Sequence, residues 1–153
     1  MLFDSAPMLI SFDTGIIVNC VLSQESLGLV AKMWGQSGHK FVISSEAEDE
    51  SIRKLCRTFN YQRDDAIKEV GDVIKTLKIE RKVAEQIDYI EGDKLTRKYG
   101  KDEFGRDICH DPDNTIIAHV KRLEVELVLT CDGKFAGICQ SEGMQTFLTY
   151  PIN

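Results

Sequence analysis

Two short apolar runs, far apart in this chain of 153 residues, each lead to an aspartate. Residues 8–12 (Met-Leu-Ile-Ser-Phe) precede Asp13, and residues 127–130 (Leu-Val-Leu-Thr) are followed by Cys131 and Asp132. Runs of this length with so few polar residues are typical of strands that are buried on both faces, as in a parallel sheet. Other segments of the chain must therefore cover both faces of a sheet, and an aspartate follows two of its strands.

Stretches with helical spacing separate these runs. Over residues 16–34 apolar side chains recur every three or four positions, with a break near Ser23, and the segment from Gly35 to Gly38 closes this pair of helices. The other elements expected are a strand at 41–43, a helix capped by Ser44 or Ser45, a helix from Asp64, a helical stretch over 80–99 interrupted near Gly92, a polar segment at 100–110 with one short strand, a helix from Pro112, a short helix at 133–141 and a strand at 146–149.

This alternation predicts the α/β class. Strands that alternate with helices indicate a three-layer α/β/α sandwich around a central, mostly parallel sheet, here of four or five strands. The length fits a single domain over residues 1–153. The middle of the chain shows no strand pattern, so we expect a helical insertion or lid at about 60–100.

Composition narrows the class of protein. Hydrophobic residues make up 42% and charged residues 29% of the chain, as in ordinary globular proteins. No apolar run approaches the roughly 20 residues that span a membrane, and residues 1–7 lack the basic region of a secretory signal. We therefore expect a cytoplasmic protein with no membrane partner. The five cysteines form no C-x-x-C pair, so we expect free thiols and not a cysteine-built zinc site.

Four acids are expected to meet at one edge of the sheet. Asp13 and Asp132 end strands, Glu50 lies early in the helix after the second strand, and Asp113 lies at the start of the helix before the strand at 127–130. Parallel sheets bind ligands at the carboxyl ends of their strands. Four carboxylates there would repel one another without a cation, and oxygen ligands suit Mg²⁺ or Mn²⁺.

Each acid also has an ordinary structural explanation. Asp13 or Asp113 would cap a helix, Glu50 would be a solvated surface residue, and Asp132 with Gly133 would form a turn. The prediction of a metal site therefore rests on the four acids together.

Four segments, in this order, resemble the motifs of the PIN-domain family of nucleases. They are Phe12-Asp13-Thr14-Gly15-Ile16-Ile17-Val18, then the segment from Ser44 to Leu55 with its acid at Glu50, then Asp111-Pro112-Asp113-Asn114-Thr115-Ile116-Ile117-Ala118, and finally Leu127-Val128-Leu129-Thr130-Cys131-Asp132. The resemblance spans most of the chain, although residues 60–105 contribute nothing to it. Gly15 departs from the family's usual Asn, and Lys134 stands where many members carry a further acid.

The resemblance implies a PIN-like α/β/α sandwich and a ribonuclease that depends on Mg²⁺ or Mn²⁺. It implies that Asp13, Glu50, Asp113 and Asp132 are the catalytic and metal-binding residues, and it implies frequent homodimers. Many small members are toxins with a protein antitoxin as partner, others process RNA, and some are inactive scaffolds.

The formal net charge of −6 argues against an RNA partner, because nucleic-acid binders usually carry a basic patch. Basic residues do cluster locally, as at Arg53, Lys54 and Arg57, although such clusters are more often solvated helix faces than RNA-binding tracks.

The four acids and the family resemblance together lead us to expect metal-assisted hydrolysis of RNA phosphodiester bonds. Asp13 would be the central ligand, Asp113 and Asp132 would complete the metal shell, Glu50 would hold a water or a second ion, and Thr130 would orient a carboxylate.

Three alternatives stay open to different degrees. A catalytically inactive PIN-like module that binds RNA or protein is favoured by Gly15 and Lys134. A phosphoryl-transfer or receiver domain that is phosphorylated on Asp13 is disfavoured, because phosphatases of that kind carry an Asp two residues later. A nucleotide-binding domain is weaker still, since neither G-x-G-x-x-G nor G-x-x-x-x-G-K is present.

Overall fold

The computed structural model describes residues 6–35 and 38–149. Its strands are β1 (Leu9–Phe12), β2 (Lys40–Ser44), β3 (Ile79–Lys82), β4 (Leu127–Thr130) and β5 (Gln145–Leu148). Its helices are α1 (Thr14–Leu22), α2 (Gln24–Trp34), α3 (Ser45–Phe59), α4 (Arg63–Thr76), α5 (Gln86–Tyr99), α6 (Asp113–Arg122) and α7 (Gly133–Ser141). Part of the expected Gly35–Gly38 closure and the first five residues of the N-terminal stretch lie outside the described residues.

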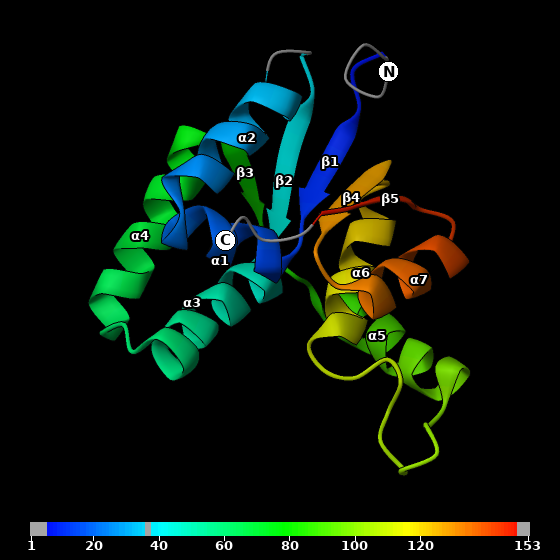
Figure 1. Cartoon of the computed structure of the whole chain (residues 1–153). Coiled ribbons are helices and arrows are strands. Elements are labelled where there is room, and N and C mark those ends of the chain that lie inside the picture. Colours follow the sequence, from blue (N-terminus) through cyan, green and yellow to red (C-terminus); the bar gives the residue numbers. More distant parts are fainter. Residues whose placement is uncertain (1–5, 36–37, 150–153) are drawn as a thin grey trace.

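The five strands form one parallel sheet in the order β3-β2-β1-β4-β5. From β1 the chain proceeds outward through β2 to β3, and then crosses to β4 and β5. Because parallel crossovers are right-handed, the helices of the two halves cover opposite faces of the sheet. Figure 1 shows α1 to α4 gathered on one side and α5 to α7 on the other. The predicted three-layer α/β/α sandwich is confirmed, with five strands.

The apolar runs form the centre of the sheet, as predicted. Ile10 and Phe12 of β1 are fully buried, and all four residues of β4 are buried. Phe12 packs edge-on against Phe41 of β2, with 5.2 Å between the ring centroids. At the start of α2, the Ser23 side chain accepts a hydrogen bond from the Ser26 backbone N–H at 3.2 Å, which explains the break predicted there.

The middle of the chain differs from the prediction, because residues 79–82 form strand β3. This strand (Ile-Glu-Arg-Lys) lies at the edge of the sheet, and only Ile79 is buried. Because its other three residues are charged, the strand has no apolar pattern by which the sequence could predict it. The segment at 100–110 contains a single bridge between Lys101 and Asp107 in place of a strand. The function of the helices at about 60–100 as an insertion or lid stays a prediction.

Helix α5 runs through Gly92 without the predicted interruption. A Cβ atom at this position would lie 3.0 Å from the backbone nitrogen of Thr115 in α6. The glycine therefore permits close packing of the two helices and does not break α5.

All five cysteines are free thiols, as expected. Within the described ranges, no helix combines the length and the apolar character needed to cross a membrane.

Candidate metal centre

The ends of β1 and β4 meet at the point where the strand order reverses. Phe12 of β1 pairs with Leu129 of β4, and the backbone N–H of Asp13 donates a hydrogen bond to the Leu129 carbonyl at 2.9 Å. The two strands that lead to Asp13 and Asp132 are therefore neighbours in the sheet. Ligands of open parallel sheets bind in the crevice at such a reversal point.

Asp13 is held by the strand next to it. Its side chain is 6% exposed, and the Thr130 hydroxyl donates a hydrogen bond to Asp13 Oδ2 at 2.8 Å. The Thr130 oxygen also accepts a hydrogen bond from the backbone N–H of Asp132 at 3.0 Å. Asp13 holds the N-cap position of α1 without a capping hydrogen bond from its side chain, and Thr130 orients its carboxylate, as predicted.

Asp113 and Asp132 lie in different local settings. Asp113 is the first residue of α6, after the cap position at Pro112, and its side chain is 18% exposed. Asp132 is exposed and caps α7, because its Oδ1 accepts hydrogen bonds from the backbone N–H groups of Lys134 and Phe135 at 3.0 and 3.2 Å. Asp132 is thus a helix cap whatever else it does.

Glu50 lies one and a half turns into α3 and is half-buried. Among the described residues, no hydrogen bond or ion pair engages its carboxylate. A half-buried acid without a partner differs from the fully solvated surface residue that is the ordinary explanation for Glu50.

The charges of these acids act on one another. Burial raises the pKa of Asp13 to about 6, and the nearby carboxylates of Glu50 and Asp132 add to the rise. Hydrogen bonds from the Thr130 hydroxyl and the Thr14 backbone oppose it. Asp13 is therefore a carboxyl group that folding holds in an environment unfavourable to negative charge.

Asp113 shows the same effect more strongly. Burial and the Asp13 carboxylate raise the pKa of Asp113 to about 7, and Glu50 and Asp132 contribute further. The His110 imidazole opposes this rise, and its Nε2 lies 3.6 Å from Asp113 Oδ2. All four predicted acids thus share one electrostatic environment at the carboxyl ends of the strands.

The donors fit a hard divalent cation by type and charge. Carboxylate oxygens are the ligands that Mg²⁺ and Mn²⁺ prefer, and in the part of the chain that the structure describes no Lys or Arg forms an ion pair with any of the four acids. The four carboxylates are not close enough together in this structure to coordinate one ion. No group of three or more His, Cys, Asp or Glu side chains in residues 6–35 and 38–149 is arranged to hold a metal ion.

Gly15 is explained by its neighbour Cys131. A Cβ atom at position 15 would lie 2.2 Å from the Cys131 sulfur, so that the thiol fills the space where a larger residue would lie. The amide nitrogen of Asn19, one turn further along α1, lies 3.9 Å from the same sulfur. The motif comparison identified the departure at Gly15 but could not identify Cys131 as its complement, because the two residues are far apart in the sequence.

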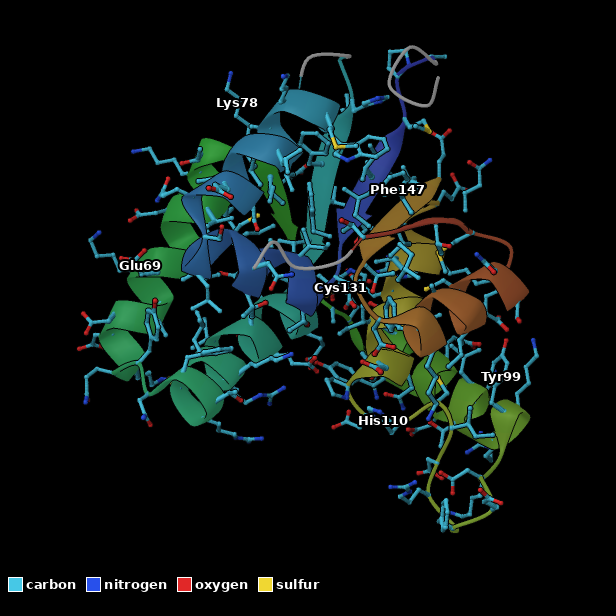
Figure 2. The ribbon with its side chains drawn as sticks, viewed as in Figure 1. Glu69, Lys78, Tyr99, His110, Cys131 and Phe147 are labelled. Atoms are coloured by element: carbon cyan, nitrogen blue, oxygen red, sulfur yellow. The ribbon has the colours of Figure 1, made fainter. Side chains whose placement is uncertain are left out.

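His110 was not among the predicted site residues. It precedes the third motif by one position, and Figure 2 shows it at the end of the molecule toward which β1 and β2 point. Lys134, the second departure, has an exposed side chain. Its ammonium group contributes to holding the pKa of Asp102 below the ordinary value, after the stronger effects of the Arg106 and Phe104 backbone.

Comparisons with known proteins identify the fold. No protein-family model and no curated protein matches the chain. Among solved structures, VapBC2 from Rickettsia felis bound to a promoter DNA fragment matches with a TM-score of 0.64 and 16% identity over 92% of this chain and 98% of that one. VapBC-1 from nontypeable Haemophilus influenzae matches with a TM-score of 0.63 and 17% identity over 92% of this chain and 98% of that one.

Mycobacterium tuberculosis VapC20, a sarcin-ricin loop cleaving toxin, matches with a TM-score of 0.61 and 13% identity over 84% of this chain and 94% of that one. At these identities the likeness concerns the architecture of the chain. The protein therefore has the fold of the VapC-type PIN-domain toxins, in agreement with the resemblance of its four motifs.

Proposed function

We propose that the protein is a ribonuclease that depends on Mg²⁺ or Mn²⁺ and hydrolyses RNA phosphodiester bonds. The buried carboxylate of Asp13 is the observation that carries this proposal. It lies at the reversal point of the sheet, has no cationic partner among the described residues, and has a pKa raised by burial and by other acids. A bound divalent cation would offset the repulsion among these carboxylates.

The four acids would share the work. Asp13, held by Thr130, would be the central ligand, and Asp113 and Asp132 would complete the metal shell. Glu50 would hold a water or a second ion. When bound, the cation supplies Lewis acidity that activates water and offsets charge on the phosphate.

The structural neighbours support a toxin of a toxin–antitoxin pair. One neighbour is described as a toxin that cleaves the sarcin-ricin loop, and another as a toxin–antitoxin complex from Klebsiella pneumoniae. For this chain we infer an RNA substrate, a protein antitoxin as partner and a cytoplasmic location. A homodimer stays a prediction from the family resemblance.

Cleavage of a labelled RNA pool with Mn²⁺ or Mg²⁺ tests the proposal. Asp13→Asn and Glu50→Gln should each lose at least 100-fold in rate, the size expected when a group that acts on the metal or the reacting charge is removed. Glu69→Gln is the matched control, because Glu69 is a half-buried helical acid in α4 (Figure 2). Equal rates for Asp13→Asn and the parent would contradict the assignment.

An inactive RNA- or protein-binding module is the second candidate. The absence of a ready three-ligand cluster within the described residues is the observation that favours it. Metal-independent RNA binding without cleavage by the parent protein would support this candidate over the nuclease.

A further inference from the structure

Helix α3 changes the sign of its charge along one face. Its first half carries Glu46 and Glu50, and its second half carries Arg53, Lys54 and Arg57. Glu46, Glu50, Arg53 and Arg57 follow one another at intervals of three or four positions, a spacing that places residues on one face of a helix, and Lys54 lies four positions after Glu50 on the same face. The buried face of α3 is separate and holds Ala47, Ser51, Ile52 and Leu55. We call Arg53, Lys54 and Arg57 the basic stripe.

The basic stripe is exposed and unpaired. Its three side chains are exposed, and in the ranges 6–35 and 38–149 none of them forms an ion pair or a side-chain hydrogen bond. Elsewhere basic residues do pair with acids, as Arg81 does with Glu48 at 3.0 Å. Glu50 precedes Lys54 by four positions, the arrangement that favours a helical ion pair, and the two still form none. In a chain with net charge −6, cations left unpaired on one face are available to an anionic ligand.

The stripe begins next to the candidate metal centre. Glu50, one of the four acids, lies three positions before Arg53 and four positions before Lys54 in α3, so the stripe starts within about one helical turn of that carboxylate. Arg57 lies seven residues beyond Glu50, or about 10 Å along the helix axis at 1.5 Å per residue. Successive phosphates of one stacked strand rise by about 3.4 Å, so this length spans roughly three phosphates.

We propose that the basic stripe binds the phosphate backbone of a single strand of RNA whose cleavage site lies at the acidic centre. This inference rests on the proposed nuclease function and names the path of its substrate. One row of cations along one helix matches one backbone, as in proteins that bind single strands along a positively charged track. The four acids repel the scissile phosphate and its neighbours, and the stripe offsets that repulsion on one side of the cut.

Salt-dependent binding of RNA tests the inference without requiring cleavage. A fluorescent single-stranded RNA is titrated with Asp13→Asn protein at fixed low Mg²⁺ and several KCl concentrations, and anisotropy gives the affinity. Each phosphate contact on a single strand contributes about 0.7 to the slope of log affinity against log salt. Arg57→Gln should lower the slope by about 0.7, and the triple variant Arg53→Gln, Lys54→Gln, Arg57→Gln by about 2.

Lys75→Gln is the matched control. Lys75 is an exposed basic residue of the last turn of α4, as Arg57 is of α3. The carbonyl of Lys75 accepts a hydrogen bond from the backbone N–H of Lys78. Figure 2 shows Lys78 at the opposite end of the molecule from His110, so Lys75 also lies far from the candidate metal centre. The control should keep the affinity and the salt slope of the parent, and thermal melts should show that all variants fold.

The outcomes separate the two proposals. An unchanged slope in the triple variant overturns the basic stripe and leaves the nuclease proposal standing. A reduced slope together with a parent enzyme that does not cut RNA supports the stripe and contradicts the nuclease. No RNA binding by the Asp13→Asn protein overturns the basic stripe, and cleavage by the parent then decides the nuclease proposal separately. Unchanged RNA affinity with lost binding of polyglutamate would assign the stripe to an acidic protein segment and overturn the inference.

Discussion

The buried carboxyl group of Asp13 makes the stability of the folded protein depend on pH. Its pKa is raised from the ordinary 3.8 to about 6, mainly by burial. A carboxyl group with a raised pKa in the folded state contributes its full stability below the unfolded value and loses it as the pH rises through the folded value. The loss for Asp13 thus develops between about pH 4 and pH 6 and is complete above, with a size on the order of 2–3 kcal/mol.

Asp13→Asn should therefore stabilise the metal-free protein at pH 8 by about 2 kcal/mol, because the amide cannot ionise in the buried site. At pH 4 the variant should show little advantage, since Asp13 is then mostly neutral in the folded protein. Urea unfolding in a chelator at both pH values measures the difference. A variant less stable than the parent at pH 8 would show that Asp13 is not an unfavourable charge.

Thr130 is the residue that orients the site. Its hydroxyl donates to Asp13 and accepts from the backbone N–H of Asp132. Thr130→Val keeps the shape and removes both hydrogen bonds, and should lower the free energy of unfolding by about 1–3 kcal/mol. Thr146→Val, at a partly exposed position of β5, removes only a hydrogen bond from the exposed Gln140 side chain and should change the free energy of unfolding by roughly 0.5 kcal/mol or less. Equal effects of the two substitutions would contradict the role given to Thr130.

At the scale of helices, Gly92 lets α5 approach α6. Alanine there would gain about 1 kcal/mol of helix propensity, but its Cβ would lie 3.0–3.1 Å from backbone atoms of Asn114 and Thr115. We expect Gly92→Ala to destabilise the protein by about 1–2 kcal/mol, because α6 must move.

Gly137→Ala in α7 provides the control, because a Cβ there meets nothing within 4 Å. This substitution should stabilise the protein by about 0.5–1 kcal/mol. Urea unfolding measures both variants, and a stabilising Gly92→Ala would mean that the two helices are not in close contact at this position.

Elements with a complete apolar pattern were predictable from the sequence. The central strands β1, β2 and β4 carry buried apolar runs, and α7 was predicted with the bounds observed. Strand β3 was missed because an edge strand buries few side chains, and Glu80, Arg81 and Lys82 give it no apolar pattern. Gly92 was misinterpreted because a glycine within a helical pattern can mark either a break in the helix or a close contact with another helix. The sequence of α5 alone does not distinguish the two, because the contact is with α6.

The placement of the four acids at one edge of the sheet was predictable from the sequence, but their contacts were not. Strand ends and helix starts meet at one edge of a parallel sheet, so four acids from residues 13 to 132 could be placed together. The contact between Gly15 and Cys131 and the position of His110 depend on side-chain packing between distant segments. The roles of the four acids as metal ligands stay predictions.

At the scale of the whole molecule, the reversal of strand order brings these acids from both halves of the chain to one edge. No single element contains the four acids, since Asp13 follows β1, Glu50 lies in α3, Asp113 begins α6 and Asp132 lies between β4 and α7. A cation bound there would link all four elements. A ligand that binds only the folded protein raises the free energy of unfolding, by about 2.7 kcal/mol at a concentration of 100 Kd.

Thermal unfolding at pH 8 under increasing Mn²⁺, for the parent, Asp13→Asn and Glu69→Gln, tests most directly whether the four acids form one metal centre. The melting temperature of the parent and of Glu69→Gln should rise with Mn²⁺ and level off, while that of Asp13→Asn should stay constant. An equal rise in all three proteins, or no rise in the parent, would contradict a divalent cation centre at Asp13.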